Sequence, residues 1–141
     1  MPIILASIVI FVIALLIYIE NTTFGVTRMD VHSKKTPASF NGFKIAHLSD
    51  QHISNFDHFQ EKVVRDLQNE KPDIIAITGD LVNGRNYNAS ACIKFIDQII
   101  KIAPVYFVSG NHEWYDYHFP SFRKQLGEKA WSCLEIVAQR L

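Results

Sequence analysis

Residues 73–80 read DIIAITGD, an apolar run that stops at a glycine and an aspartate. An apolar run without alternation is typical of a strand that is buried on both faces of a parallel sheet. Two further strand-like runs occur at residues 44–48 and 104–109, one on each side of it in the sequence. We therefore expect three strands at these positions.

Segments with a helical pattern separate the three strands. Residues 57–70 and 89–102 carry apolar side chains three or four positions apart, which is the spacing of one helix face. Pro72 follows the first segment and Pro104 follows the second, as expected where helices end. Because strands that alternate with helices of this length imply right-handed crossovers and parallel pairing, the predicted fold class is α/β.

Polar side chains follow each predicted strand at the point where it ends. They are Asp50 and His52, then Asp80, then Asn111 and His112. In an open parallel sheet, ligands bind outside the carboxyl ends of the strands, so we expect these side chains to converge. Gly79 and Gly110 each precede a candidate ligand, as expected where the backbone must approach a bound group without a Cβ in the way.

The chemistry of these side chains points to metal ions. Carboxylate and amide oxygens together with imidazole nitrogens suit divalent ions such as Mn, Fe, Zn or Ni. The absence of cysteine from these motifs argues against a structural zinc site with thiolate ligands. Two ions about 3.5 to 4 Å apart can activate a shared water and hold a phosphate through its oxygens, while an imidazole beside them serves as general acid.

Three short motifs resemble those of a known family. DxH at residues 50–52, GD at residues 79–80 and GNHE at residues 110–113 resemble, in order and spacing, the first three motifs of the calcineurin-like metallophosphoesterases. The similarity covers about residues 43–114. The apolar N-terminal segment and the stretch HLSDQH at residues 47–52 both resemble the membrane-associated bacterial branch of the family, whose relatives include lipid-linked pyrophosphate hydrolases. It implies the N-terminal half of a metallophosphoesterase β-sandwich flanked by helices. The implied substrate is a phosphomonoester, a phosphodiester or a lipid-linked pyrophosphate.

The resemblance also implies a role for each motif residue, with two divalent metal ions as cofactors. Asp50 and His52 would bind the first metal ion, and Asp80 would bridge both ions. Asn111 would bind the second ion, while His112 would protonate the leaving oxygen with the assistance of Asp50.

The chain also departs from the family pattern. Family members continue with a further histidine and a GHxH motif, which complete both metal sites and the second half of the sandwich, and neither occurs in this sequence. We therefore interpret residues 43–141 as a truncated phosphoesterase domain, from a fragment or a frameshifted product, with a helix-like tail at residues 130–141. The alternative to an active hydrolase is an inactive membrane-anchored fragment or a binding module without catalysis. Gln51 occupies a position that is often apolar, and Glu113 is expected to orient its loop rather than bind metal.

The first part of the chain predicts a membrane anchor. No charged residue occurs from Pro2 to Ile19, and a helix of about seventeen residues is roughly 26 Å long, close to the hydrocarbon thickness of a bilayer. We predict one transmembrane helix at residues 1–19, in a single-pass membrane protein, and a linker at residues 20–42. A cleaved signal peptide and a buried soluble helix are the alternatives. Basic side chains within residues 28–35 favour a cytoplasmic C-terminal domain.

Composition argues against one class of partner. The formal net charge is zero and no basic cluster follows Lys35, so we expect no nucleic-acid partner.

Cys92 and Cys133 lie far apart in helix-like segments and are predicted to be buried free thiols. His47 is expected to be a hydrogen-bonded residue of the sheet. The aromatic residues in 114–119 either line a substrate entrance or pack as a loop over the sheet edge.

Overall fold

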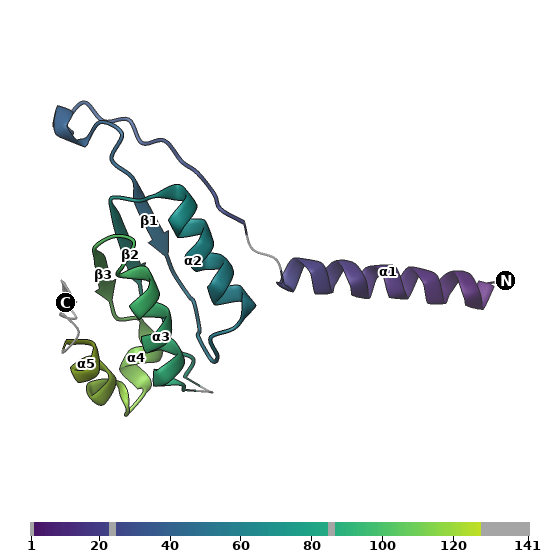
Figure 1. Ribbon diagram of the computed structural model, residues 1–141. Helices are drawn as coiled ribbons and strands as arrows, with labels where there is room; N and C mark the ends of the chain where they lie inside the picture. Colours follow the sequence, from purple (N-terminus) through teal and green to yellow (C-terminus); the bar gives the residue numbers. More distant parts are fainter. Residues whose placement is uncertain (1, 23–24, 85–86, 128–141) are drawn as a thin grey trace, which may run out of the picture. The chain divides into compact units, whose positions relative to one another are not determined.

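The computed structural model describes residues 2–22, 25–84 and 87–127. Its ribbon is shown in Figure 1, and the chain divides into two compact units after Lys35. The first unit contains helix α1, Pro2–Thr22, and the second contains the sheet and the remaining helices. The second unit therefore carries every residue that was predicted to bind metal.

Helix α1 is built from the uncharged N-terminal segment. Its side chains from Ile4 to Tyr18 are exposed, and the large ones among them are aliphatic or aromatic. Within the described residues, we find no helix with both the length and the apolar character needed to cross a membrane. The helical conformation of this segment agrees with the sequence, whereas the transmembrane helix at residues 1–19 stays a prediction.

Three parallel strands form the centre of the second unit, which confirms the predicted α/β class. They are β1, Ile45–Leu48, β2, Ile74–Thr78, and β3, Val105–Val108, and β2 lies between the other two. β2 pairs in parallel with both neighbours. Ile75 and Ile77 of this central strand are fully buried, and the central position explains its uninterrupted apolar run.

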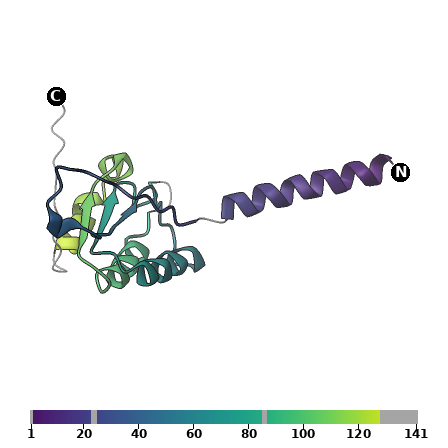
Figure 2. The same cartoon turned by 90° about the horizontal axis from the view of Figure 1, so that it is seen from above.

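Helices α2, His58–Glu70, and α3, Ala89–Ile99, lie side by side against one face of the sheet (Figures 1 and 2). α2 begins where the Asp57 carboxylate accepts a hydrogen bond from the Phe59 N–H at 2.9 Å, which satisfies a free donor of the first helical turn. The helix ends at Glu70, because the next residue, Lys71, has left-handed backbone with a φ of 49°.

Helix α3 is shorter than predicted. The Asn88 side chain caps its beginning by accepting a hydrogen bond from the Ala91 N–H at 3.1 Å. The sequence pattern predicted a helix to Ile102, but the helix ends at Ile99. A tight turn follows, in which the Ile102 N–H donates to the Ile99 carbonyl at 3.0 Å. Pro104 bounds this turn, because proline disfavours helical backbone in the residue before it, Ala103.

The core lies between this face of the sheet and the two helices. Apolar side chains of both helices and of the sheet fill it: Val63, Val64, Leu67, Phe95, Ile96, Ile99, Ile75, Ile77 and Phe107. Cys92 of α3 is a fully buried free thiol, as predicted, and burial, together with the Glu113 carboxylate, raises the pKa of Cys92 to about 12. Cys133 and the predicted helix-like tail at residues 130–141 lie outside the described residues.

The opposite face of the sheet is more open. Side chains alternate along a strand, so Ile45 and His47 of β1 share this face with Thr78 of β2. Ile45 is 61% exposed. His47 Nε2 lies 2.6 Å from Thr78 Oγ1, which confirms that His47 is a hydrogen-bonded sheet residue.

In the described part of the chain, which ends at residue 127, two helices follow β3, namely α4, Asn111–Tyr115, and α5, Phe119–Gly127. The aromatic residues in 114–119 therefore fall at the end of α4 and the beginning of α5. Tyr115 and Tyr117 are 82% and 84% exposed. The interpretation as a loop packed over the sheet edge is wrong for these two side chains, because the turn between the helices leaves them at the surface.

Candidate metal centre

The segments that leave β1 and β2 continue side by side beyond the strands. The Asp50 N–H donates to the Gly79 carbonyl at 3.3 Å, and the His52 N–H donates to the Asp80 carbonyl at 2.9 Å. These hydrogen bonds extend the parallel pairing through the residues that were predicted as ligands. The carboxyl ends of the two strands therefore present their polar side chains at one edge of the sheet, as expected.

Three of the predicted site residues have left-handed backbone. Their φ angles are 53° at Asp50, 44° at His52 and 52° at Asp80. This region is uncommon for residues other than glycine, although aspartate and histidine enter it more often than most. Such conformations cost about 1–3 kcal/mol each and cluster at functional sites, where the surrounding structure holds them in place.

Glu113 connects the ends of β2 and β3. Its side chain is fully buried, and its carboxylate accepts hydrogen bonds from three backbone N–H groups. Oε2 accepts from Gly110 at 2.7 Å and from Asp80 at 2.9 Å, and Oε1 accepts from Val82 at 3.0 Å. This arrangement agrees with the expectation that Glu113 orients its loop rather than binding metal.

Gly79 and Gly110 allow the two strand ends to touch. A Cβ on Gly79, whose φ is +97°, would lie 2.7 Å from Gly110 Cα. A Cβ on Gly110 would collide with Asp80 Oδ1. The two glycines were expected to make room for a bound group, but the atoms nearest to them belong to the neighbouring strand end. Their physical role is therefore close packing of backbone against backbone.

Three side chains converge at this edge, and we call His52, Asp80 and His112 the metal centre. Each offers one ligand atom, and these atoms lie within 4.8 Å of one another. The rings of His52 and His112 meet edge to face, with centroids 4.5 Å apart and an interplanar angle of 79°. Asp80 Oδ1 also accepts a hydrogen bond from the His112 N–H at 2.9 Å. Imidazole nitrogens and carboxylate oxygens are ligands that divalent transition metals accept.

The other two predicted ligands lie beside the metal centre. Asp50 Oδ1 is 3.9 Å from His52 Nε2, and Ser49 Oγ donates a hydrogen bond to Asp50 Oδ2. Asn111 lines a pocket of about 220 Å³ together with His112. Metal binding by Asp50 and Asn111, and the assistance of Asp50 to His112, stay predictions. Gln51, at the often apolar position of the first motif, has a buried Oε1 without a hydrogen-bond partner among the described residues.

His112 has a defined tautomer, which no sequence pattern predicts. Its Nδ1 accepts a hydrogen bond from the Gly84 N–H at 3.2 Å. The proton of the neutral ring is thereby assigned to Nε2, which can donate it. In this tautomer neither ring nitrogen of His112 is free to bind metal, whereas Nε2–H can donate a hydrogen bond to a leaving oxygen. The only sequence signal for Gly84 is that it lies in an Asn-Gly turn.

Comparison with known proteins agrees with the motifs. Residues 43–138 match the family model of the calcineurin-like phosphoesterases. A transmembrane protein with metallophosphoesterase domain from Bos taurus is 32% identical over 97 residues, which are 64% of this chain and 21% of that protein. The uncharacterized metallophosphoesterase YkuE from Bacillus subtilis is 32% identical over 68 residues, which are 47% of this chain and 24% of that protein.

A further relative carries a more specific name. The UDP-2,3-diacylglucosamine pyrophosphatase LpxG from Chlamydia muridarum is 27% identical over 103 residues, which are 71% of this chain and 31% of that protein. The chain thus spans 21% to 31% of the length of these three relatives.

Proposed function

Because this chain belongs to the calcineurin-like phosphoesterase family, whose members hydrolyse phosphoester bonds, we propose that its metal centre hydrolyses a phosphoester. The observation that carries the proposal is the convergence of His52, Asp80 and His112, from three different strand ends, within 4.8 Å of one another. When bound, divalent ions would supply an activated water and neutralise charge on the phosphate.

The residues divide into binding and proton-donating roles. Asp50, His52 and Asp80 would hold the first ion, and Asp80 has a second carboxylate oxygen with which to bridge to another. Asn111 would bind that second ion. His112 would donate a hydrogen bond from Nε2 to the leaving oxygen in the tautomer that the Gly84 N–H holds, and it would protonate that oxygen from its imidazolium form.

The substrate class is a phosphomonoester, a phosphodiester or a lipid-linked pyrophosphate. Two observations favour the lipid-linked class. One relative is named a UDP-2,3-diacylglucosamine pyrophosphatase. The other is α1, which presents exposed apolar side chains from Ile4 to Tyr18.

A hydrolysis assay tests the proposed activity. We expect the full chain with Mn²⁺ to hydrolyse bis(p-nitrophenyl) phosphate, and Asp80→Asn to abolish turnover and lower the content of bound metal. Asp66→Asn is the matched control, because Asp66 pairs with Lys62 on the surface of α2, away from the strand ends. The absence of both turnover and bound metal in the unaltered chain would favour the alternative, an inactive fragment or a binding module.

We further propose that α1 anchors the chain to a membrane, with the C-terminal domain on the cytoplasmic side. The support is the uncharged sequence from Pro2 to Ile19 and the basic side chains that follow within residues 28–35. Membrane fractionation tests the anchor. Ile10→Asp and Ile13→Asp together should move the chain to the supernatant, while Met29→Asp should leave it in the membrane fraction. A reporter fused to the C-terminus tests the side of the membrane.

A further inference from the structure

We propose that Ser54 is a positioning residue, whose hydroxyl group fixes the turn that holds the imidazole of His112 at the metal centre. The inference rests on the proposed function, in which His112 donates a hydrogen bond from Nε2 to the leaving oxygen. It extends the site to a residue outside the three family motifs, which acts on the reaction through His112.

The backbone of Gly84 lies directly against the ring of His112. The Gly84 N–H donates to His112 Nδ1 at 3.2 Å, and a Cβ on Gly84 would lie 2.9 Å from the same nitrogen. Glycine therefore allows the close approach, and any larger side chain would push the ring aside. The place of the ring at the metal centre thus depends on where the backbone of Gly84 lies.

The segment before Gly84 is held by two neighbouring parts of the chain. Ile53 forms a parallel bridge with Val82, and the Ile53 N–H donates to the Leu81 carbonyl at 2.8 Å. In addition, Glu113 Oε1 accepts a hydrogen bond from the Val82 N–H at 3.0 Å. These contacts fix the backbone as far as Val82.

A hydrogen bond between side chains continues this pairing to the next residue. Asn83 Nδ2 donates to Ser54 Oγ at 2.9 Å, and both residues are half-buried. Asn83 directly precedes Gly84, so this hydrogen bond sets the direction in which the backbone enters the turn. Without the Ser54 hydroxyl, the backbone of Gly84 gains freedom to move away from His112.

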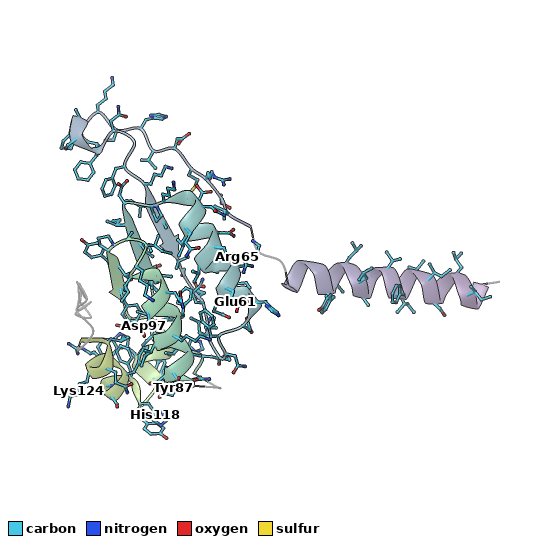
Figure 3. The ribbon with its side chains drawn as sticks, in the orientation of Figure 1. Glu61, Arg65, Tyr87, Asp97, His118 and Lys124 are labelled. Carbon is cyan, nitrogen blue, oxygen red and sulfur yellow. The ribbon has the colours of Figure 1, made fainter. Side chains whose placement is uncertain are left out.

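Ser54 is itself attached to the start of α3. Its carbonyl accepts a hydrogen bond from Asn88 Nδ2 at 2.9 Å, and Asn88 caps this helix. Tyr87, the residue before Asn88, stacks on His118 with ring centroids 5.0 Å apart and an interplanar angle of 7°, and Figure 3 shows these two residues next to each other. A group that is tied to a helix is held more precisely than one that depends on a loop alone.

Nuclear magnetic resonance tests the positioning itself. We label the full chain in detergent with ¹⁵N at glycine and histidine and add no metal, because Mn²⁺ broadens the signals. We expect a scalar coupling across the hydrogen bond between the Gly84 amide nitrogen and His112 Nδ1. Ser54→Ala should abolish this coupling, and Ser54→Thr, which keeps the hydroxyl, should retain it. Ser33→Ala is the matched control, because it also removes a serine hydroxyl that accepts one hydrogen bond, in the first unit.

Two matched esters test the effect on the reaction in the full chain with Mn²⁺. Bis(p-nitrophenyl) phosphate and diphenyl phosphate differ only in the nitro groups, so phenolate is the more basic leaving group and depends more on a hydrogen bond from His112. We expect Ser54→Ala to lower kcat for diphenyl phosphate roughly tenfold, with a smaller loss for the nitrophenyl ester and no change in either KM. Ser54→Thr should restore kcat.

A second variant acts on the ring without altering Ser54. Gly84→Ala places a Cβ against His112 Nδ1 and should reproduce the larger loss for diphenyl phosphate. Equal losses of kcat for the two esters in Ser54→Ala, or no loss for either, would overturn the inference and leave the proposed activity intact. A Gly84–His112 coupling that Ser54→Ala leaves unchanged would do the same. Failure of the unaltered chain to hydrolyse either ester would overturn the proposed function and the inference together.

Discussion

At the scale of single residues, the metal centre depends on side chains at three strand ends and on the contacts that hold those ends together. His52, Asp80 and His112 could be predicted because parallel strands place their carboxyl ends at one edge. The hydrogen bond from Gly84 to His112 could not, because it depends on how a loop folds back over α4. The contact between Gly79 and Gly110 also depends on the spacing of two strands, which no local pattern encodes.

Glu113 provides the sharpest prediction at this scale. We expect Glu113→Leu to lower the free energy of unfolding by about 3 kcal/mol or more, since it leaves three backbone N–H groups without their acceptor and each costs about 1–3 kcal/mol. Urea denaturation followed by circular dichroism measures the change. The control is Glu61→Gln on α2, whose side chain is 47% exposed and should change stability little. A loss below 1 kcal/mol in Glu113→Leu would show that Glu113 does not connect the strand ends.

Gly110 gives a second prediction. Gly110→Ala places a Cβ against Asp80 Oδ1 and the Asp80 backbone nitrogen, so the end of β2 must move. We expect a loss of roughly 1–3 kcal/mol in stability, typical of overpacking, together with weaker Mn²⁺ binding in calorimetry. Gly25→Ala is the matched control, because a Cβ there has no neighbour within 4 Å among the described residues. Unchanged Mn²⁺ affinity in Gly110→Ala would contradict the tight contact between this glycine and Asp80.

At the scale of elements, periodicity located the strands and helices and was weakest at their ends. Two strands, β1 and β2, begin one residue later than predicted. The third, β3, is one residue shorter than predicted at each end. The end of α3 was misjudged because the apolar spacing continues through Ile100 and Ile102, while the backbone already turns ahead of Pro104. The five-residue helix α4 was missed, since it is too short to show a period.

The packing of α3 on the sheet predicts an unreactive thiol. Burial raises the pKa of Cys92 to about 12, so at pH 8 the thiol is protonated as well as shielded. In a Cys133→Ser background, we expect Ellman's reagent to react with Cys92 only on unfolding, at a rate that urea increases strongly. Because the folded pKa is raised above its ordinary value of 9.0, the thiol favours the folded state below about pH 9, and this contribution disappears as the pH rises toward 12. Rapid labelling without urea would mean that α3 is not closely packed.

At the scale of the whole molecule, the second unit is covered unevenly. α2 and α3 bury one face of the sheet (Figures 1 and 2), and β1 and β3 form its edges in the described part of the chain. On the other face, Ile45 of the edge strand β1 is 61% exposed. The backbone groups along the free edge of β1 can pair with another strand. A net charge of zero gives little electrostatic repulsion between copies. These features favour association through the open face.

We therefore expect the full chain, held in detergent, to associate as its concentration rises, and Ile45→Lys to reduce this association. The added lysine places a charge on the open face next to the edge of β1, where it opposes strand pairing between copies. Sedimentation velocity over a tenfold range of concentration measures the effect. Met29→Lys adds the same charge in the first unit, at a residue that is 83% exposed, and should change association less. Equal effects of the two substitutions would assign the association to net charge rather than to the open face of the sheet.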